Sequence, residues 1–174
     1  IQLSILESYF SIKFFVSKIP NKDWVGKVLR DLKPVIEGSF LISNSYHAVN
    51  SPVNKSLILV EAAMAFGTGH HPTTIGCLRA IQHFRKIRII PKRVADIGCG
   101  TGILAIGISK AFRSRVIASD IDLVAVQTAR QNIVVNGQKS NITLVHANGL
   151  DNSLYQESKL FDLIVANILS TPLR

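Results

Sequence analysis

A run of alternating glycines between a short apolar segment and a helical pattern constrains the fold of this chain more than any other feature. Residues 94–102 read V-A-D-I-G-C-G-T-G. A β-carbon at Gly98 or Gly100 would stand between the backbone and a ligand, and glycine also allows the positive φ angles that a tight turn needs. The run predicts a strand, a turn that a ligand approaches closely, and a helix, although tight turns alone explain many glycine triplets.

From residue 94 onward, short apolar runs alternate with helical patterns, which is typical of a parallel sheet built from strand-helix-strand units. We expect strands at residues 93–97, 116–120, 142–146 and 161–166. We also expect helices at residues 101–111 and 123–136, the second closed by Gly137, and a further helix that opens upstream at Pro72. These elements predict the α/β class, with a Rossmann-like parallel sheet and helices on both faces.

Residues 1–45 fit no complete structural unit. They contain patterns for a strand at residues 12–16, a short helix at residues 23–32 and an apolar run at residues 40–42. We therefore expect a domain boundary near residue 46, which divides the chain into residues 1–45 and 46–174.

The composition favours a soluble cytoplasmic protein. Hydrophobic residues make up 47% and charged residues 18%, which excludes disorder, and no apolar run approaches the roughly 20 residues that span a bilayer. The chain opens at Ile1 without the pattern of a signal peptide, so we interpret it as the interior of a longer gene product. Its two cysteines, Cys77 and Cys99, give neither a disulfide framework nor the spacing of metal ligands.

The formal net charge is +9, and the positive residues concentrate in the stretch 79–115. Such a stretch suits RNA, an acidic partner or simply a solvated helix end and loop. Because no aromatic residues are interleaved for base stacking, we favour the solvated surface and expect no direct nucleic-acid contact. The adjacent His70 and His71 point in different directions and have no further ligand at suitable spacing, so we expect no metal.

An acidic residue narrows the choice of ligand. Asp120 ends the second predicted strand, where a carboxylate can accept hydrogen bonds from both hydroxyls of an adenosine ribose. Ile103 stands where the G-x-G-x-x-G fingerprint requires its third glycine, which disfavours a dinucleotide enzyme. S-adenosylmethionine suits the pattern because it has no pyrophosphate and needs only close backbone contact, a ribose carboxylate and an apolar adenine slot. We expect it to bind at Gly98, Gly100 and Asp120.

Two nearby residues have structural interpretations. Asp96 is expected to order the glycine turn by accepting backbone N–H bonds. Cys99 has no basic residue arranged beside it, so we interpret it as a small buried side chain rather than a nucleophile.

Two further segments resemble a known family. Residues 61–74 read E-A-A-M-A-F-G-T-G-H-H-P-T-T and residues 165–169 read V-A-N-I-L. They resemble the F-G-T-G-x-H-P-T-T and V-A-N-I-L signatures of the PrmA family, class I methyltransferases that modify the large-subunit ribosomal protein L-eleven. The resemblance implies S-adenosylmethionine contacts at Thr74, Gly98, Asp120 and Asn167. At the carboxyl edge of the sheet, Asn167 would also be the catalytic residue that holds a substrate amine in line with the methyl group.

The resemblance also implies a reaction and a domain plan. The expected reaction is N-methylation of lysine or α-amino groups of a ribosomal protein. Residues 1–45 would be the remnant of an N-terminal substrate-recognition domain and linker, and residues 46–174 the methyltransferase domain. That fold normally has seven strands in the order 3-2-1-4-5-7-6, so a chain that stops after the fourth leaves residues 161–169 as an apolar edge.

Three alternatives stay open. One is a methyltransferase of the same fold that acts on RNA or a small molecule; residues 168 and 169, Ile and Leu, depart from the Asn-Pro-Pro-aromatic pattern of base-methylating enzymes. The second is an inactive truncated remnant that at most binds cofactor. The third is a dinucleotide enzyme. We expect the 174-residue chain by itself not to methylate a ribosomal protein at a useful rate.

Overall fold

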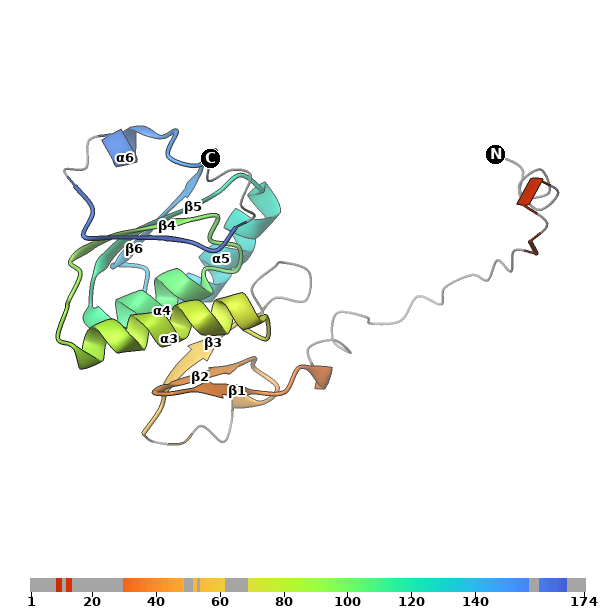
Figure 1. Ribbon diagram of the computed structural model, residues 1–174, viewed down its shortest axis with the longest axis horizontal. Helices are drawn as coiled ribbons and strands as arrows, with labels where there is room; N and C mark the ends of the chain where they lie inside the picture. Colours follow the sequence, from red (N-terminus) through yellow and green to blue (C-terminus); the bar gives the residue numbers. More distant parts are fainter. Residues whose placement is uncertain are drawn as a thin grey trace.

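The computed structural model describes residues 9–10, 12–13, 30–48, 52, 54–61, 69–156 and 160–168. Most of the predicted strand at 12–16 and of the predicted helix at 23–32 therefore lies outside the described residues. Within these residues, two sheets and the helices labelled α3 to α6 carry the fold (Figure 1).

The larger sheet has four parallel strands in the order β6-β5-β4-β7. These strands are β4 (Arg93–Ile97), β5 (Arg115–Asp120), β6 (Ile142–His146) and β7 (Leu163–Ala166). All four predicted strands are confirmed within two residues at each end. Their order is the 3-2-1-4 part of the expected sheet, so the carboxyl ends of β4, β5 and β7 meet at one edge.

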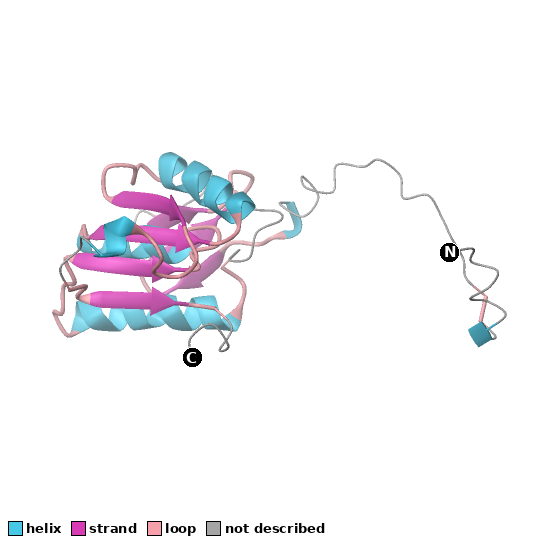
Figure 2. Ribbon diagram, turned by 90° about the horizontal axis from the view of Figure 1, so that it is seen from above, coloured by secondary structure: helices cyan, strands magenta, loops and turns pink. Residues whose placement is uncertain are grey.

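Helices cover both faces of this sheet, as predicted. α3 (Pro72–Lys86), α4 (Ile103–Phe112) and α5 (Leu123–Val135) lie on one face, and the short α6 (Ser153–Gln156) lies on the other (Figures 1 and 2). On the α6 face, Tyr155 packs against Ala95 and Ile97. α4 is buried over most of its surface, because a second sheet packs on the side that faces away from β4.

That second sheet is small and mixed. β1 (Val35–Glu37) pairs antiparallel with β2 (Phe40–Ser43), and β2 pairs parallel with β3 (Ser56–Leu59). Phe40 and Ile58 are buried in the same apolar core as Leu78 of α3. Strands on both sides of residue 46 form this sheet, and the division of the chain at that residue stays a prediction.

β7 lies at the edge of the larger sheet. Among the described strands its neighbour is β4, and Ile164 in its middle is 56% exposed. The sequence predicts an apolar edge at residues 161–169, and β7 forms this edge at residues 163–166. No helix in the described part of the chain is long and apolar enough to cross a membrane.

Candidate functional site

The glycine turn between β4 and α4 has a left-handed backbone at three alternate positions. φ is +68° at Gly98, +55° at Gly100 and +77° at Gly102, a region that glycine adopts without strain. The amide of Cys99 donates to the carbonyl of Ser119 on β5 at 2.8 Å. The turn is thus bonded to the neighbouring strand of the sheet and directs its backbone toward the carboxyl edge.

Gly98 allows the chain after β7 to come close to the turn. A β-carbon built on Gly98 would lie 2.3 Å from Cγ2 of Ile168, well inside van der Waals contact. The sequence pattern predicts that the missing β-carbon at Gly98 leaves room for a ligand. The structure adds a second reason for glycine, because any larger residue at position 98 would displace Ile168 and its neighbour Asn167.

Asp120 ends β5 and reaches back to the turn. Its Oδ2 accepts the amide of Gly100 at 2.8 Å, and its Oδ1 accepts the amide of Asp122 at 3.0 Å. Each carboxylate oxygen has a further lone pair that can accept from a ligand hydroxyl. Ile121, which follows Asp120, is 66% exposed and gives an apolar surface at the same strand end.

Thr74 and Asn167, which lie 93 residues apart in the sequence, meet at the same edge of the sheet. The carboxamide nitrogen of Asn167 donates to Oγ1 of Thr74 at 3.2 Å. Thr74 lies in the first turn of α3 and is fully buried, whereas Asn167 follows β7 and is half-buried. The hydrogen bond therefore joins the start of α3 to the end of β7, beside the glycine turn.

Asp96 lies beneath the turn and is 1% exposed. Its Oδ2 accepts the amide of Ala105 in the first turn of α4 at 3.0 Å, which agrees with the expected loop-ordering role. Its Oδ1 is buried and has no hydrogen-bond partner among the described residues. Burial raises the pKa of this carboxyl to about 7; the Ala105 amide acts against that rise and the charge of Asp120 adds to it.

Comparison with known proteins identifies the family. The model of the family "Ribosomal protein L11 methyltransferase (PrmA)" matches residues 2–174. The chain belongs to this family. Ribosomal protein L11 methyltransferases of Rhodopseudomonas palustris and Rhizobium rhizogenes are each 43% identical to it, over 159 and 155 residues. Those alignments cover 91% and 89% of the chain but 54% and 53% of the relatives, so the chain spans about half the length of the curated relatives it matches.

A solved structure agrees with this assignment. The ribosomal protein L11 methylase of Lactobacillus delbrueckii subsp. bulgaricus superposes with a TM-score of 0.68 at 31% sequence identity. The match covers 82% of this chain and 69% of that one. The Rossmann-like methyltransferase fold expected from the sequence is therefore confirmed.

The cysteines and histidines near the PrmA signature have structural surroundings. Cys99 is 6% exposed, and burial raises the pKa of its thiol, which suits an inert side chain. His70 Nε2 lies 2.9 Å from the carbonyl of Lys33. His71 is the N-cap of α3, and its side chain accepts the amide of Thr73. Across the described residues, no group of three His, Cys, Asp or Glu side chains could hold a metal ion.

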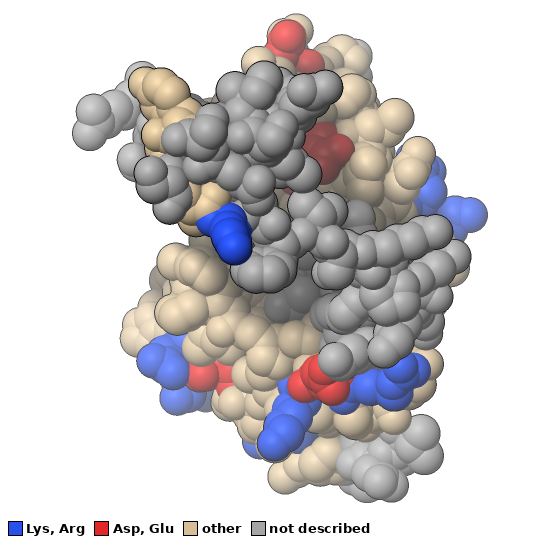
Figure 3. Space-filling view, turned by 90° about the vertical axis from the view of Figure 1, so that its right-hand side faces the viewer, with Lys and Arg blue, Asp and Glu red and all other residues tan. Residues whose placement is uncertain are grey.

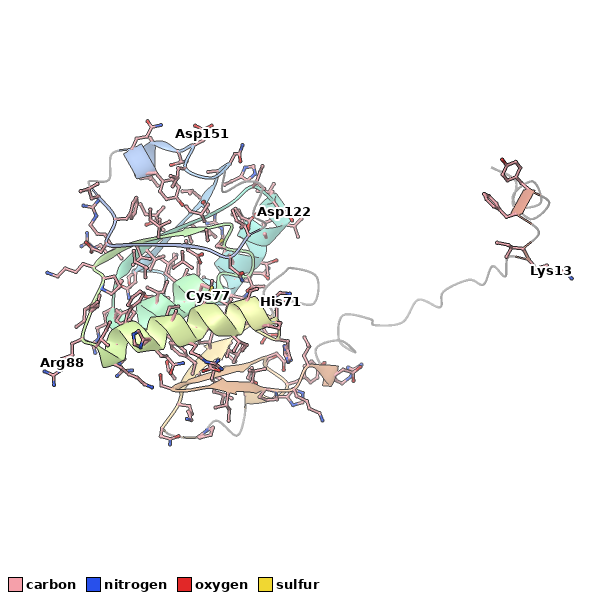
Figure 4. The ribbon with its side chains drawn as sticks, viewed as in Figure 1. Lys13, His71, Cys77, Arg88, Asp122 and Asp151 are labelled. Atoms are coloured by element: carbon pink, nitrogen blue, oxygen red, sulfur yellow. The ribbon has the colours of Figure 1, made fainter. Side chains whose placement is uncertain are left out.

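The basic stretch at 79–115 runs from α3 through β4, the glycine turn and α4 to the start of β5. His71 and Arg88 mark the two ends of α3 and lie on opposite sides of the molecule, and Asp122 lies on the side of His71 (Figure 4). On that side, Lys and Arg alternate with Asp and Glu along the lower part of the described surface (Figure 3). The visible charge on this face is thus mixed rather than uniformly basic.

Sequence reasoning missed residues that support the turn from α5. Asn132 is fully buried, and its carboxamide nitrogen donates to the carbonyl of Thr101 at 2.9 Å. Ala129, one turn earlier, lies against Gly102. The sequence does mark this residue. Asn132 follows Ala125 and Ala129 at helical spacing, so it is a polar residue on the apolar face of the helix.

Proposed function

We propose that this chain forms the cofactor-binding part of an S-adenosylmethionine-dependent methyltransferase that N-methylates a large-subunit ribosomal protein. The observation that carries the proposal is the hydrogen bond between Thr74 and Asn167 beside the glycine turn. It joins the two PrmA signatures into one site. The printed names of the relatives support the substrate, and a ribosomal substrate implies a cytoplasmic location.

The residues at the carboxyl edge fit S-adenosylmethionine. The second lone pairs of the Asp120 oxygens would accept the ribose hydroxyls, and the exposed Ile121 offers an apolar contact for adenine. The backbone at Gly98 and Gly100 would contact the methionine part. Beneath the turn, Oδ1 of Asp96 is a buried polar atom that has no hydrogen-bond partner in the described part of the chain. When bound, the cofactor supplies a methyl group on a sulfonium, which is a good leaving group.

Asn167 would orient the attacking amine. Thr74 Oγ1 accepts from the carboxamide nitrogen, so the carboxamide oxygen of Asn167 would be the atom that accepts an N–H of the substrate. Asn167 would hold the neutral amine with its lone pair directed at the methyl group that the bound cofactor would supply, and the cofactor would leave as a neutral thioether. Since a lysine amine has a pKa near roughly 10.4, it first loses a proton to water. Positioning of this kind contributes up to ~7–11 kcal/mol.

The proposal predicts that Asn167→Ala lowers the rate of methyl transfer far more than the affinity for cofactor. The loss would be on the order of 100-fold in single-turnover rate with less than about threefold in dissociation constant, because Asn167 acts on the acceptor amine. The assay uses the gene product that contains this chain, labelled S-adenosylmethionine and the purified ribosomal protein. Asn141→Ala, at the opposite edge of the sheet, is the control and should change neither value.

The same assay separates the alternatives. Methyl transfer to free ribosomal protein but not to ribosomal RNA supports the proposal. Transfer to RNA alone would assign the basic stretch a substrate role and contradict the protein substrate. Equal losses in rate and affinity for Asn167→Ala would show that Asn167 is only a cofactor contact.

A further inference from the structure

Two buried asparagines, Asn132 in α5 and Asn136 at its C-cap, bond the backbone where the small sheet ends. Asn136 accepts the amide of Leu59 at 3.0 Å and donates to the carbonyl of Leu59 at 2.7 Å. Asn132, one helical turn earlier, accepts the amide of Glu61 at 2.9 Å. These carboxamides form hydrogen bonds with backbone N–H and C=O groups at the end of β3, as a neighbouring strand would do. Both side chains lie in the core, where an unpaired polar group is costly.

The other end of Asn132 reaches the glycine turn. Its Nδ2 donates to the carbonyl of Thr101 at 2.9 Å, and both residues are fully buried. Ala129 on the same face of α5 packs so closely that a β-carbon on Gly102 would lie 3.2 Å from its Cβ. α5 thus supports the turn by packing and by a hydrogen bond from one side chain.

Such support matters because the turn itself is conformationally permissive. Glycine loses more backbone freedom on folding than any other residue, and Gly98, Gly100 and Gly102 all have positive φ. The turn is held on the β5 side by the bonds of Cys99 and Gly100. Asn132 adds a bond on the α5 side and at the same time connects the turn to Glu61, which follows β3.

We propose that Asn132 is a positioning residue for the cofactor site. Its carboxamide fixes the carbonyl of Thr101 relative to the end of the small sheet, and so sets the backbone of the glycine turn before cofactor binds. Asn132 acts through the turn and not by touching the cofactor. The inference rests on the proposed cofactor function of this turn.

Asn136 gives a matched control. Asn132→Leu leaves one buried carbonyl and one buried amide without their partner, on Thr101 and Glu61. Asn136→Leu likewise leaves one amide and one carbonyl, both on Leu59, and also removes a bond to the carbonyl of Asn132, which keeps the backbone amide of residue 136 as a partner. The two variants should therefore lose similar stability in urea unfolding. They differ in that only Asn132 contacts the turn.

The experiment measures the 174-residue chain in two ways. Hydrogen exchange without ligand should be at least about tenfold faster at the amides of Cys99 and Gly100 in Asn132→Leu, and unchanged there in Asn136→Leu. Calorimetry with S-adenosylhomocysteine should show binding weakened at least about tenfold by Asn132→Leu and less than about threefold by Asn136→Leu. If Asn132→Leu does not fold, Asn132→Asp replaces it, because the carboxylate keeps the acceptor for Glu61 and loses the donor to Thr101.

The outcomes separate this inference from the proposed function. Equal effects of the two asparagine variants on exchange at the turn would show that Asn132 is only a core hydrogen bond, and would overturn the inference. Failure of the unmodified chain to bind S-adenosylhomocysteine would contradict the proposed cofactor site, while the exchange measurement would still decide the role of Asn132.

Discussion

At the scale of single residues, Asp96 is a carboxyl that the fold holds in an unfavourable environment for its charge. Its pKa is raised from 3.8 to about 7, chiefly by burial, so the folded chain binds a proton that the unfolded chain has released between these pH values. The contribution of Asp96 to stability therefore falls as pH rises from about 4 to about 7 and then levels off. The difference between the two pKa values corresponds to ~4 kcal/mol over that range.

We predict that Asp96→Asn removes most of this slope. The amide keeps an oxygen for the N–H of Ala105 and carries no charge, so the variant should be more stable than the parent chain at pH 8. Urea unfolding from pH 4 to pH 8 measures it. A variant whose stability changes with pH as much as that of the parent chain would rule out a protonated buried Asp96.

At the scale of elements, the sequence predicted the parts that carry long periodic patterns. The start of the helix at Pro72, the strands β4 to β7 and the helices α4 and α5 agree with the predicted boundaries within two residues, whereas the short α6 was not predicted. The small sheet escaped prediction apart from its apolar run at 40–42. Its strands have three or four residues, and the parallel pairing of β2 with β3 joins segments with no helical pattern between them.

Side-chain bonds between distant segments also escaped prediction. Gln82 on α3 accepts the amide of Ser39 at 2.6 Å and donates to the carbonyl of Glu37 at 2.8 Å, across more than 40 positions of sequence. No local pattern marks such a pair. These bonds brace the β1–β2 hairpin against α3.

We predict that Gln82→Ala destabilises the chain by about 2 kcal/mol, because it leaves a part-buried amide and a carbonyl of the hairpin without their partner. Arg79→Ala is the control on the same helix, and it breaks the ion pair with Glu37. The Arg79 side chain is 71% exposed, so that variant should change the midpoint little. Urea unfolding midpoints that fall equally in both variants would contradict the bracing role of Gln82.

At the scale of the whole molecule, the candidate site is assembled at one edge of the parallel sheet. The turn after β4, the acid that ends β5 and the residue after β7 meet there because parallel strands end at the same edge. The glycines and Asp120 could be inferred from their own local pattern. Thr74 and Asn167 came from the family resemblance, since only the folded chain brings residues 93 positions apart into contact.

We expect Asp120, at the carboxyl edge of the parallel sheet, to bind the adenosine part of S-adenosylmethionine. Asp122 offers a matched control two residues away, since it caps α5 through the amide of Val124 and its carboxylate makes no bond to the turn among the described residues. Asp120→Ala removes both the acceptor for the ribose and the bond to Gly100. Asp122→Ala removes only a helix cap.

Calorimetric titration of the parent chain and these two variants with S-adenosylhomocysteine tests the claim most directly. We expect the parent chain to bind S-adenosylhomocysteine. Asp120→Ala should weaken the affinity about fivefold or more, which corresponds to ~1 kcal/mol or more, and Asp122→Ala should change it less than about twofold. Binding that is equally strong in the parent chain and in Asp120→Ala would contradict it.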